Sequence, residues 1–364
     1  MPADKPASGC AARRAALAEV LAERRLDALL ITSLPNIRYL AGFTGSNAML
    51  LALPGRALLF TDPRYAIQAS AETDCPVKVS KGSILADLAA ALKRRRVRRL
   101  GFERSRMSFE LFDGLRSHLP LHSSLEPLAG AVERLRMVKS EGEIALIRRS
   151  VETNSRAFET AARHLRTGMS ESDLAAEIEY RMRRLGAEKP AFDTIVAAGA
   201  RSALPHAAPT GARFQARDLV LVDMGAMQAG YASDMTRMLF FGTPGAKVRK
   251  LYAAVREAQA AAVAAVRAGV EAGAVDRAAR RVLRAAGFER AFVHSTGHGL
   301  GLEIHEAPRL GKRESLRLEP GMTVTIEPGA YLEGFGGVRI EDTVVVTRTG
   351  CEVLTPTGKE LRTV

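Results

Sequence analysis

The sequence contains no tryptophan, few aromatic residues (5%) and only three cysteines in 364 residues. Cys10, Cys75 and Cys351 lie far apart and are odd in number, so they form neither a disulfide framework nor a CxxC metal site. No apolar run reaches the ~18 residues of a membrane span, and charged residues interrupt the apolar pattern where a signal peptide would have its core. We therefore expect a soluble cytoplasmic protein with no membrane partner.

Acidic residues are fewer than basic ones: the chain has 40 Asp and Glu against 53 Lys and Arg, which gives a formal net charge of +13. Most of the excess lies in the first 139 residues, which hold 22 basic and 13 acidic residues, and its densest part is the run Lys93–Arg99. This run follows a helical pattern, and cations are favoured at a helix C-terminus by the helix dipole. Because no aromatic side chains interleave with the cations, we expect no nucleic-acid partner.

The length is sufficient for two domains, and we predict the boundary between residues 139 and 140. In residues 1–139, helical spacing at 11–26 and 84–92 alternates with strand-like stretches at 28–32, 48–53 and 57–61. This alternation is typical of an α/β domain. Ser140 and Glu143 then match a capping box, which predicts the first helix of the second domain.

The second domain, 140–364, contains an internal repeat. Leu165–Gly168 matches Val266–Gly269 at an offset of 101 residues, and Leu219–Ala226 matches Thr323–Ala330 at an offset of 104. Each copy predicts two helices followed by a strand and a return strand. Two copies are too few for a solenoid, so we predict a duplicated, pseudo-symmetric α+β domain.

Four carboxylates occupy matched places in the two copies, one at the end of each first strand and one on each return strand. They are Asp223 and Asp234 in the first copy, and Glu327 and Glu341 in the second. Taken singly, each of these carboxylates has a simpler interpretation as an ordinary turn or edge residue that pairs with Arg237 or Arg339. Ionised carboxylates resist burial and mutual approach, so four of them on homologous hairpins favour divalent cations as neutralising partners.

Histidine adds to this pattern, because four of the only seven histidines lie around these strands. They are His206, His294, His298 and His305. A lone histidine is usually structural, but His298 lies in the glycine-rich segment Thr296–Gly301, where glycine lets ligands approach closely. One imidazole with four carboxylates suits Mn²⁺, Co²⁺, Zn²⁺ or Fe²⁺ better than Ca²⁺, and two-metal hydrolysis with a bridging water as nucleophile is the expected mechanism.

These motifs resemble those of the pita-bread metallopeptidases, which include aminopeptidase P, prolidase and methionine aminopeptidase. In the second domain the resemblance is carried by Val222–Gly225, Ser233–Arg237, Gly297–Gly301, His305–Pro308, Thr325–Gly329 and Arg339–Asp342. In the first domain, Asn36–Leu40 and Gly42–Asn47 resemble the creatinase/prolidase N-terminal domain. The resemblance covers nearly the whole chain and implies an α/β creatinase-like domain at 1–139 and a pita-bread catalytic domain at 140–364.

The resemblance also implies a role for each of the polar residues. It assigns two divalent ions, with Mn²⁺ expected first, to Asp223, Asp234, His298, Glu327 and Glu341. Glu327 would in addition take the proton of the bridging water. The residues His206, His294 and His305 would orient the peptide and stabilise the oxyanion. Arg339 would hold nearby carboxylates in place, and the chain would form a homodimer.

The expected substrates are peptides with proline in second position, because methionine aminopeptidases lack such an N-terminal domain. Gly42–Asn47 and Thr61–Tyr65 look more like bacterial Xaa-Pro aminopeptidases, so that activity, through a metal-bridging hydroxide, is the leading expectation. The alternative is an Xaa-Pro dipeptidase (prolidase), for which Arg309 is a candidate anchor of the substrate carboxylate or else a plain surface residue. A metal-free creatinase-like hydrolase and a non-catalytic binding protein are less favoured, because no expected ligand is replaced.

Overall fold

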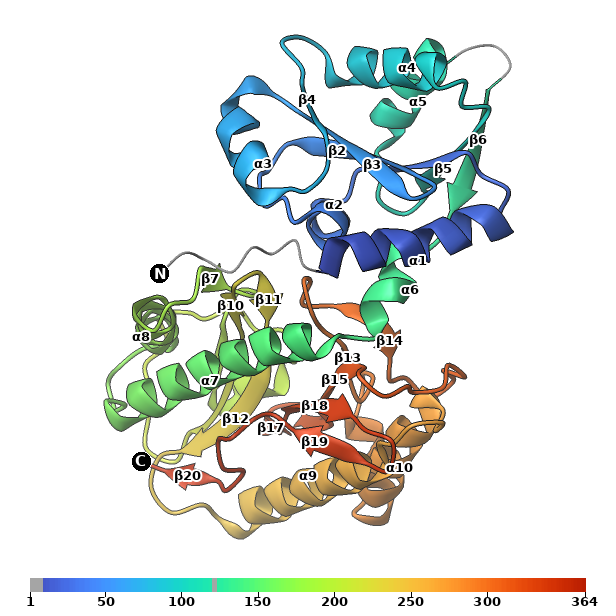
Figure 1. The fold of residues 1–364 in the computed structure, drawn as a ribbon. Helices are drawn as coiled ribbons and strands as arrows, with labels where there is room; N and C mark the ends of the chain where they lie inside the picture. Colours follow the sequence, from blue (N-terminus) through green and yellow to red (C-terminus); the bar gives the residue numbers. More distant parts are fainter. Residues whose placement is uncertain (1–8, 120–122) are drawn as a thin grey trace. The chain divides into compact units, whose positions relative to one another are not determined.

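The computed structural model describes residues 9–119 and 123–364, drawn as a ribbon in Figure 1. They form two compact units, Met1–Arg136 and Met137–Val364. The boundary predicted from the sequence, after residue 139, lies shortly beyond this division. Among the described residues, no helix combines the length and apolar character that crossing a membrane requires.

The first unit is built around a six-stranded mixed sheet with the strand order β4-β3-β2-β1-β5-β6. The strands are β1 (Ala28–Ile31), β2 (Ala48–Leu53), β3 (Arg56–Thr61), β4 (Val77–Val79), β5 (Arg99–Glu103) and β6 (Ser124–Leu128). The helices are α1 (Cys10–Glu23), α2 (Leu34–Ala41), α3 (Ala66–Glu72), α4 (Ile84–Arg94), α5 (Phe109–His118) and α6 (Ala131–Met137), with the short 3-10 helix η2 (Pro63–Tyr65). All four residues of β1 are buried, as a central strand requires, and the α/β expectation is confirmed.

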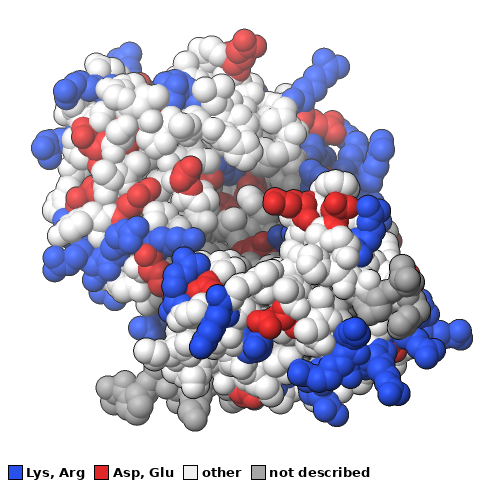
Figure 2. All heavy atoms as spheres, turned by 90° about the horizontal axis from the view of Figure 1, so that it is seen from above, with Lys and Arg blue, Asp and Glu red and all other residues white. Residues whose placement is uncertain are grey.

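The basic run of the first unit begins in the last turn of α4, which contains Lys93 and Arg94. The residue after the helix, Arg95, is its C-cap, so these cations lie beside the carbonyl end of the helix dipole. Figure 2 shows Lys and Arg gathered at several places on the face in view, with Asp and Glu between them.

The second unit consists of paired helices and four small sheets. Its helices are α7 (Glu141–Arg163), α8 (Glu171–Arg184), α9 (Ala246–Ala265) and α10 (Ala272–Ala285), with the 3-10 helices η3 (Gly199–Ala203) and η4 (Glu289–Ala291). One sheet has the order β20-β12-β9-β8, from β8 (Ile195–Ala198), β9 (Leu219–Met224), β12 (Met235–Phe240) and β20 (Arg362–Thr363). A second has the order β14-β13-β15-β18-β19, from β13 (His298–Gly299), β14 (Glu306–Arg309), β15 (Thr323–Ile326), β18 (Asp342–Val346) and β19 (Cys351–Val353). The smaller sheets join β7 (Lys189–Pro190), β10 (Ala226–Gln228) and β11 (Tyr231–Ala232), and β16 (Gly329–Leu332) with β17 (Gly336–Arg339).

The predicted duplication is visible in the order of these elements. In each half, two helices are followed by an antiparallel strand pair: α7 and α8 by β9 and β12, and α9 and α10 by β15 and β18. The capping box that predicts the start of α7 is present, since Ser140 Oγ accepts from the Glu143 backbone N–H and the Glu143 carboxylate accepts from the Ser140 N–H. The duplicated α+β architecture is therefore confirmed.

The central strands of the first half are buried on both faces. In β9, Leu219 and Leu221 pack into the cluster that contains α9 and α10, whereas Val220 and Val222 pack into the cluster that contains α7 and α8. Alternate residues of one strand therefore contribute to two different hydrophobic clusters, which explains the continuous apolar run before Asp223. This packing holds the end of β9, and the carboxylate on it, in a fixed place.

Candidate active site

Four strand ends in the second unit supply the four predicted carboxylates. Asp223 lies in β9 one residue before its end, and Glu327 follows β15 directly. Asp234 lies between β11 and β12, and Glu341 lies between β17 and β18. Residues that correspond in the two copies of the repeat therefore lie at corresponding ends of buried strands, where the hydrogen bonds of the sheet restrict the backbone.

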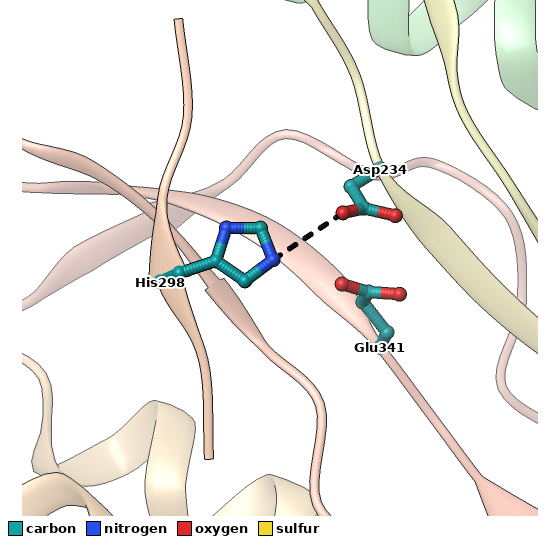
Figure 3. Close-up of side chains that lie close together, drawn as sticks. All are labelled: Asp234, His298 and Glu341. Atoms are coloured by element: carbon teal, nitrogen blue, oxygen red, sulfur yellow. Dashed lines mark ion pairs between the residues drawn. The ribbon is translucent and has the colours of Figure 1, made fainter. Parts of the chain in front are cut away.

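Three of the predicted ligands converge closely. One ligand atom each of Asp234, His298 and Glu341 lies within 4.8 Å of the others, and Figure 3 shows the imidazole directed at the two facing carboxylates. The His298 Nε2 atom is 3.6 Å from Asp234 Oδ2 and 3.4 Å from Glu327 Oε1. Asp223 lines the same pocket but turns one oxygen toward Arg339.

The hydrogen bonds of His298 leave a lone pair facing these carboxylates. Its Nδ1 lies 3.0 Å from the Gly299 carbonyl oxygen, which can only accept, so Nδ1 carries the proton. Burial lowers the pKa of His298, so the ring is neutral and Nε2 is a lone-pair donor. Nε2 and the oxygens of Asp234 and Glu327 thus present electron pairs to one small region, as ligands of a cation do.

Two buried oxygen atoms of the cluster have no hydrogen-bond partner among the described residues: Asp223 Oδ1 and Glu341 Oε1. A buried acceptor without a donor costs about 1–3 kcal/mol, and more when it is charged. Since the other oxygens of both carboxylates are hydrogen-bonded, the two orphaned atoms fit metal ligation. The donor set of four carboxylates and one imidazole suits a borderline-hard divalent ion.

The electrostatics of the cluster point the same way. Burial, together with the charges of the neighbouring carboxylates, raises the pKa values of Asp234 and Glu341 well above the usual range. Burial also raises the pKa of Glu327 to about 7, although Arg339 opposes this shift. The protein alone does not balance these negative charges.

Arg339 is the cation that lies within the cluster. Its Nη2 donates to Asp223 Oδ2 at 2.5 Å, and its Nε donates to Thr236 Oγ1 at 3.0 Å. Thr236 in turn donates to Glu341 Oε2 at 2.7 Å, so one guanidinium orients two of the carboxylates. The other arginine considered from the sequence, Arg237, pairs with none of the four carboxylates within the described part of the chain. Its Nη1 donates to the Glu341 main-chain carbonyl, and its Nη2 donates to Asp342 Oδ1 because β12 directs it to the opposite face of the sheet from Thr236.

A chain of hydrogen bonds leads from Arg339 to His294. Arg339 Nη1 donates to the Tyr331 hydroxyl at 2.6 Å, and that hydroxyl lies 2.8 Å from His294 Nε2. His294 Nδ1 lies 2.8 Å from the Ser295 carbonyl oxygen, to which it donates, and burial lowers the pKa of His294 to about 4. The neutral ring therefore accepts from Tyr331, and both of its nitrogens are engaged by the protein.

His206 and His305 differ from His294, because neither imidazole has a hydrogen-bond partner among the described residues. Both line the pocket, and the His305 ring lies 4.3 Å from the His298 ring, centroid to centroid. Burial also lowers the pKa of His305. Unlike His294, these two histidines leave both ring nitrogens available to a molecule in the pocket.

The nine residues to which the family resemblance assigns a role in the site line one pocket of about 740 Å³ within the second unit. Those residues are His206, Asp223, Asp234, His294, His298, His305, Glu327, Arg339 and Glu341. Apolar side chains form another part of the wall: Phe192, Ile195, Pro205 and Ile304. Arg309 also lines it, is exposed, and makes no hydrogen bond or ion pair with any residue that the structure describes.

Roles for Tyr331 and Thr236 could not be predicted from the sequence. In the repeat Tyr331 corresponds to Met227, so comparing the two copies does not single it out. Thr236 lies in a recognised motif, but its role depends on which face of β12 meets Glu341. The close packing around the glycine-rich segment, by contrast, could be predicted from the sequence. A Cβ at Gly297 would overlap the Thr325 carbonyl oxygen, so that position requires glycine.

Buried carboxylates and one imidazole, at the ends of strands in a duplicated α+β domain, define a metal-dependent enzyme class. The chain belongs to metallopeptidase family M24, whose model matches residues 145–348, and its first unit matches the Creatinase/Prolidase N-terminal domain over residues 13–138. It is therefore a metallopeptidase with a creatinase-like N-terminal domain and a pita-bread catalytic domain, as the motifs predicted.

Known proteins resemble it over almost its full length. An Xaa-Pro dipeptidase of Pyrococcus horikoshii is 35% identical over 343 residues, covering 94% of this chain and 96% of the relative. The structure of an Xaa-Pro dipeptidase from Bacillus anthracis matches with a TM-score of 0.95 and 37% identity, covering 98% of this chain and 100% of that one. An X-Pro aminopeptidase from Thermotoga maritima matches with a TM-score of 0.89 and 38% identity, covering 94% and 99%.

Replacing Tyr331 tests the hydrogen-bond chain behind the site. Tyr331→Phe removes the hydroxyl that joins Arg339 to His294, and we expect the free energy of unfolding to fall by about 1–2 kcal/mol because the half-buried His294 Nε2 loses its donor. Urea unfolding measures this loss. Tyr180→Phe is the control, because the Tyr180 side chain is about half exposed and its hydroxyl accepts a hydrogen bond from Arg184 at the surface; equal losses in the two variants would contradict this interpretation.

Proposed function

We propose that this metallopeptidase is an Xaa-Pro dipeptidase. The observation that carries the proposal is the combination, in one pocket, of the five-donor cluster with Arg309, an exposed guanidinium that no described residue pairs. A dipeptide brings its C-terminal carboxylate close to the scissile bond, so a dipeptidase needs a cation near its metal centre. Arg309 supplies that charge, whereas Arg339 is already engaged with Asp223.

The names of the relatives support the same choice. The Pyrococcus horikoshii and Bacillus anthracis proteins are named Xaa-Pro dipeptidases, which favours this activity over the Xaa-Pro aminopeptidase activity that was the leading expectation from sequence motifs. Aminopeptidase activity stays as the second candidate because the Thermotoga maritima structure, at 38% identity, is named an X-Pro aminopeptidase.

Two divalent ions, with Mn²⁺ proposed first and Co²⁺, Zn²⁺ or Fe²⁺ as alternatives, would be held by the five predicted ligands. Those ligands are Asp223, Asp234, His298, Glu327 and Glu341. When bound, the ions supply Lewis-acid polarisation of the scissile carbonyl and acidify the attacking water. The cluster supports this assignment by its orphaned oxygens and by the lone pair of His298.

The chain's own residues would then manage the proton and the developing charge. Glu327, held by Thr325 Oγ1 at 3.2 Å from its Oε1, would accept the proton of the attacking water and return it to the leaving proline nitrogen. His206 and His305 would donate ring N–H groups to the substrate and the oxyanion, because neither ring has a hydrogen-bond partner among the described residues. The resemblance gives His294 the same role, but both of its nitrogens are engaged, so we propose instead that it orients Tyr331 and so holds Arg339 against Asp223.

Proline explains why a shaped apolar wall is required. The Xaa-Pro bond is a tertiary amide without an N–H, and the ring fixes φ, so recognition depends on the shape of the ring. Phe192, Ile195 and Ile304 offer apolar surface on the pocket wall for such a ring. Homodimerisation and a cytoplasmic location stay predictions from the family resemblance.

The proposed function is tested by peptide length. With Mn²⁺ added, the protein is expected to hydrolyse Xaa-Pro dipeptides and to leave Xaa-Pro-Yaa tripeptides intact, since a longer chain places its carboxylate beyond Arg309. Amino-acid release followed by chromatography distinguishes the two. Efficient cleavage of tripeptides would favour the aminopeptidase, and no cleavage of either would refute both candidates.

Glu327→Gln tests the proton-transfer role. We expect kcat to fall at least about 100-fold, because the amide cannot take up a proton and binds metal more weakly. The far-ultraviolet circular dichroism spectrum should be unchanged. Glu333→Gln, at an exposed carboxylate on the β16–β17 turn, is the control and should retain wild-type turnover. Near-normal turnover of Glu327→Gln would contradict the assignment.

Arg309→Gln tests the carboxylate anchor. We expect KM for an Xaa-Pro dipeptide to rise about 10- to 100-fold with a smaller change in kcat, because a hydrogen bond to a charged group is lost. The same variant should not change KM for the corresponding dipeptide amide, which has no carboxylate. Arg313→Gln, at an exposed arginine outside the pocket wall, is the control; a similar KM rise in both variants would mean that net charge alone attracts the substrate.

A further inference from the structure

The loop that carries His206 lies outside the sheet ladders. It runs from Ala198, the last residue of β8, to Thr210 and includes the short helix η3. His206 has no hydrogen-bond partner among the described residues, so the place of its imidazole depends on how the loop is held. Whatever fixes residues 198–210 therefore fixes a group that lines the pocket.

One buried carboxylate fastens both ends of this loop. Glu171, the first residue of α8, is completely buried. Its Oε1 accepts from the Ala198 N–H at 2.9 Å, and its Oε2 accepts from the Thr210 N–H at 2.9 Å and from Thr210 Oγ1 at 2.7 Å. A single rigid side chain thus joins residues that are separated along the sequence by the whole loop.

Arg201 extends this contact to the middle of the loop. Its Nε donates to both Glu171 oxygens, at 3.1 and 3.2 Å, and its Nη2 donates to the Ala208 carbonyl at 2.8 Å. On the other side, Arg339 Nη1 donates to the Pro205 carbonyl at 3.1 Å. The segment around His206 is therefore held between the Glu171–Arg201 pair and the arginine of the carboxylate cluster.

The second half of the domain uses a comparable arrangement. Asp276 in α10 is also completely buried, and its Oδ1 accepts from the Thr296 N–H at 3.1 Å and from Thr296 Oγ1 at 3.0 Å. Its partner Arg280 donates to the His294 carbonyl at 2.6 Å. In each half, a buried acid on the second helix, paired with an arginine, holds the backbone of the segment that carries a pocket histidine.

We propose that Glu171 is a positioning residue for the peptidase reaction, because its buried carboxylate closes the 198–210 loop and so sets the place of His206. The proposal rests on the proposed function for its substrate, but its geometry is independent of which peptide is cleaved. Charge-assisted hydrogen bonds from four donors to a buried carboxylate are strong and directional, so their loss loosens both ends of the loop, while the contacts of Pro205 with Arg339 and of Ser202 with Gly337 remain. A shift of about 1 Å in the position of a group that contacts the reacting atoms can lower the rate about 100-fold.

The test is a double-mutant cycle between Glu171→Gln and His206→Ala, assayed on an Xaa-Pro dipeptide. Glutamine keeps the shape of the side chain but turns an NH₂ group toward N–H donors. We expect Glu171→Gln to lower kcat/KM about 10- to 100-fold in the wild-type background and less than about twofold when His206 is already alanine. A full additional loss in the His206→Ala background would overturn the proposal.

Hydrogen exchange supplies a readout that needs neither substrate nor metal. In Glu171→Gln, peptides covering residues 198–210 should exchange faster, while those of α7 remain protected; unchanged exchange in the loop would also overturn the proposal. Thr210→Val removes only the hydroxyl donor, so it should lower kcat/KM and speed up the exchange of residues 198–210 by smaller amounts. This variant replaces Glu171→Gln in the test if Glu171→Gln does not fold. If the wild-type protein cleaves no Xaa-Pro dipeptide, the proposed function is refuted. The exchange measurement then still tests whether Glu171 holds the loop, because it needs no substrate.

Asp173→Asn is the matched control. Asp173 lies two residues further along the same helix, is exposed, and accepts the Ser170 N–H at 2.8 Å as part of a capping box without touching the loop. Its replacement weakens the same helix N-terminus, so it reports the effect of α8 stability by itself. We expect less than about a twofold change in kcat/KM and unchanged exchange of residues 198–210.

Discussion

The structure of the catalytic domain depends on a repulsion: four carboxylates are fixed close together at buried strand ends. Burial and mutual repulsion raise the pKa values of Asp234 and Glu341 far above their usual range. Hydrophobic packing on both faces of β9 keeps Asp223 in place, so the cluster cannot relax by moving apart. Divalent cations are the partners that turn this unfavourable arrangement into a stable one.

The surrounding residues orient this cluster without neutralising it. Arg339 holds Asp223 directly and Glu341 through Thr236, and it also contacts Tyr331 and the Pro205 carbonyl. One guanidinium therefore links the carboxylates to the loop of His206. The Glu171–Arg201 pair secures the same loop from the helix side, which places His206 and the carboxylates in one connected framework.

Much of this arrangement could be predicted because it repeats in the sequence. The offset between Asp223 and Glu327 showed that two carboxylates occupy equivalent strand ends, and the capping box at Ser140 marked the first helix of the domain. Contacts that depend on the face of a strand or on the path of a loop could not be predicted. Arg237 was one candidate partner for the carboxylates but faces Asp342, and Tyr331 has only Met227 as its counterpart in the repeat.

The sequence motifs also did not decide between dipeptides and longer peptides, because they could not show whether Arg309 lines the pocket or lies elsewhere on the surface. The central claim, that the buried carboxylates exist to hold divalent ions, is tested most directly by metal analysis. The purified protein, reconstituted with Mn²⁺ and freed of excess ion, is measured by inductively coupled plasma mass spectrometry. The account predicts about two ions per chain; fewer than one ion per chain would contradict it.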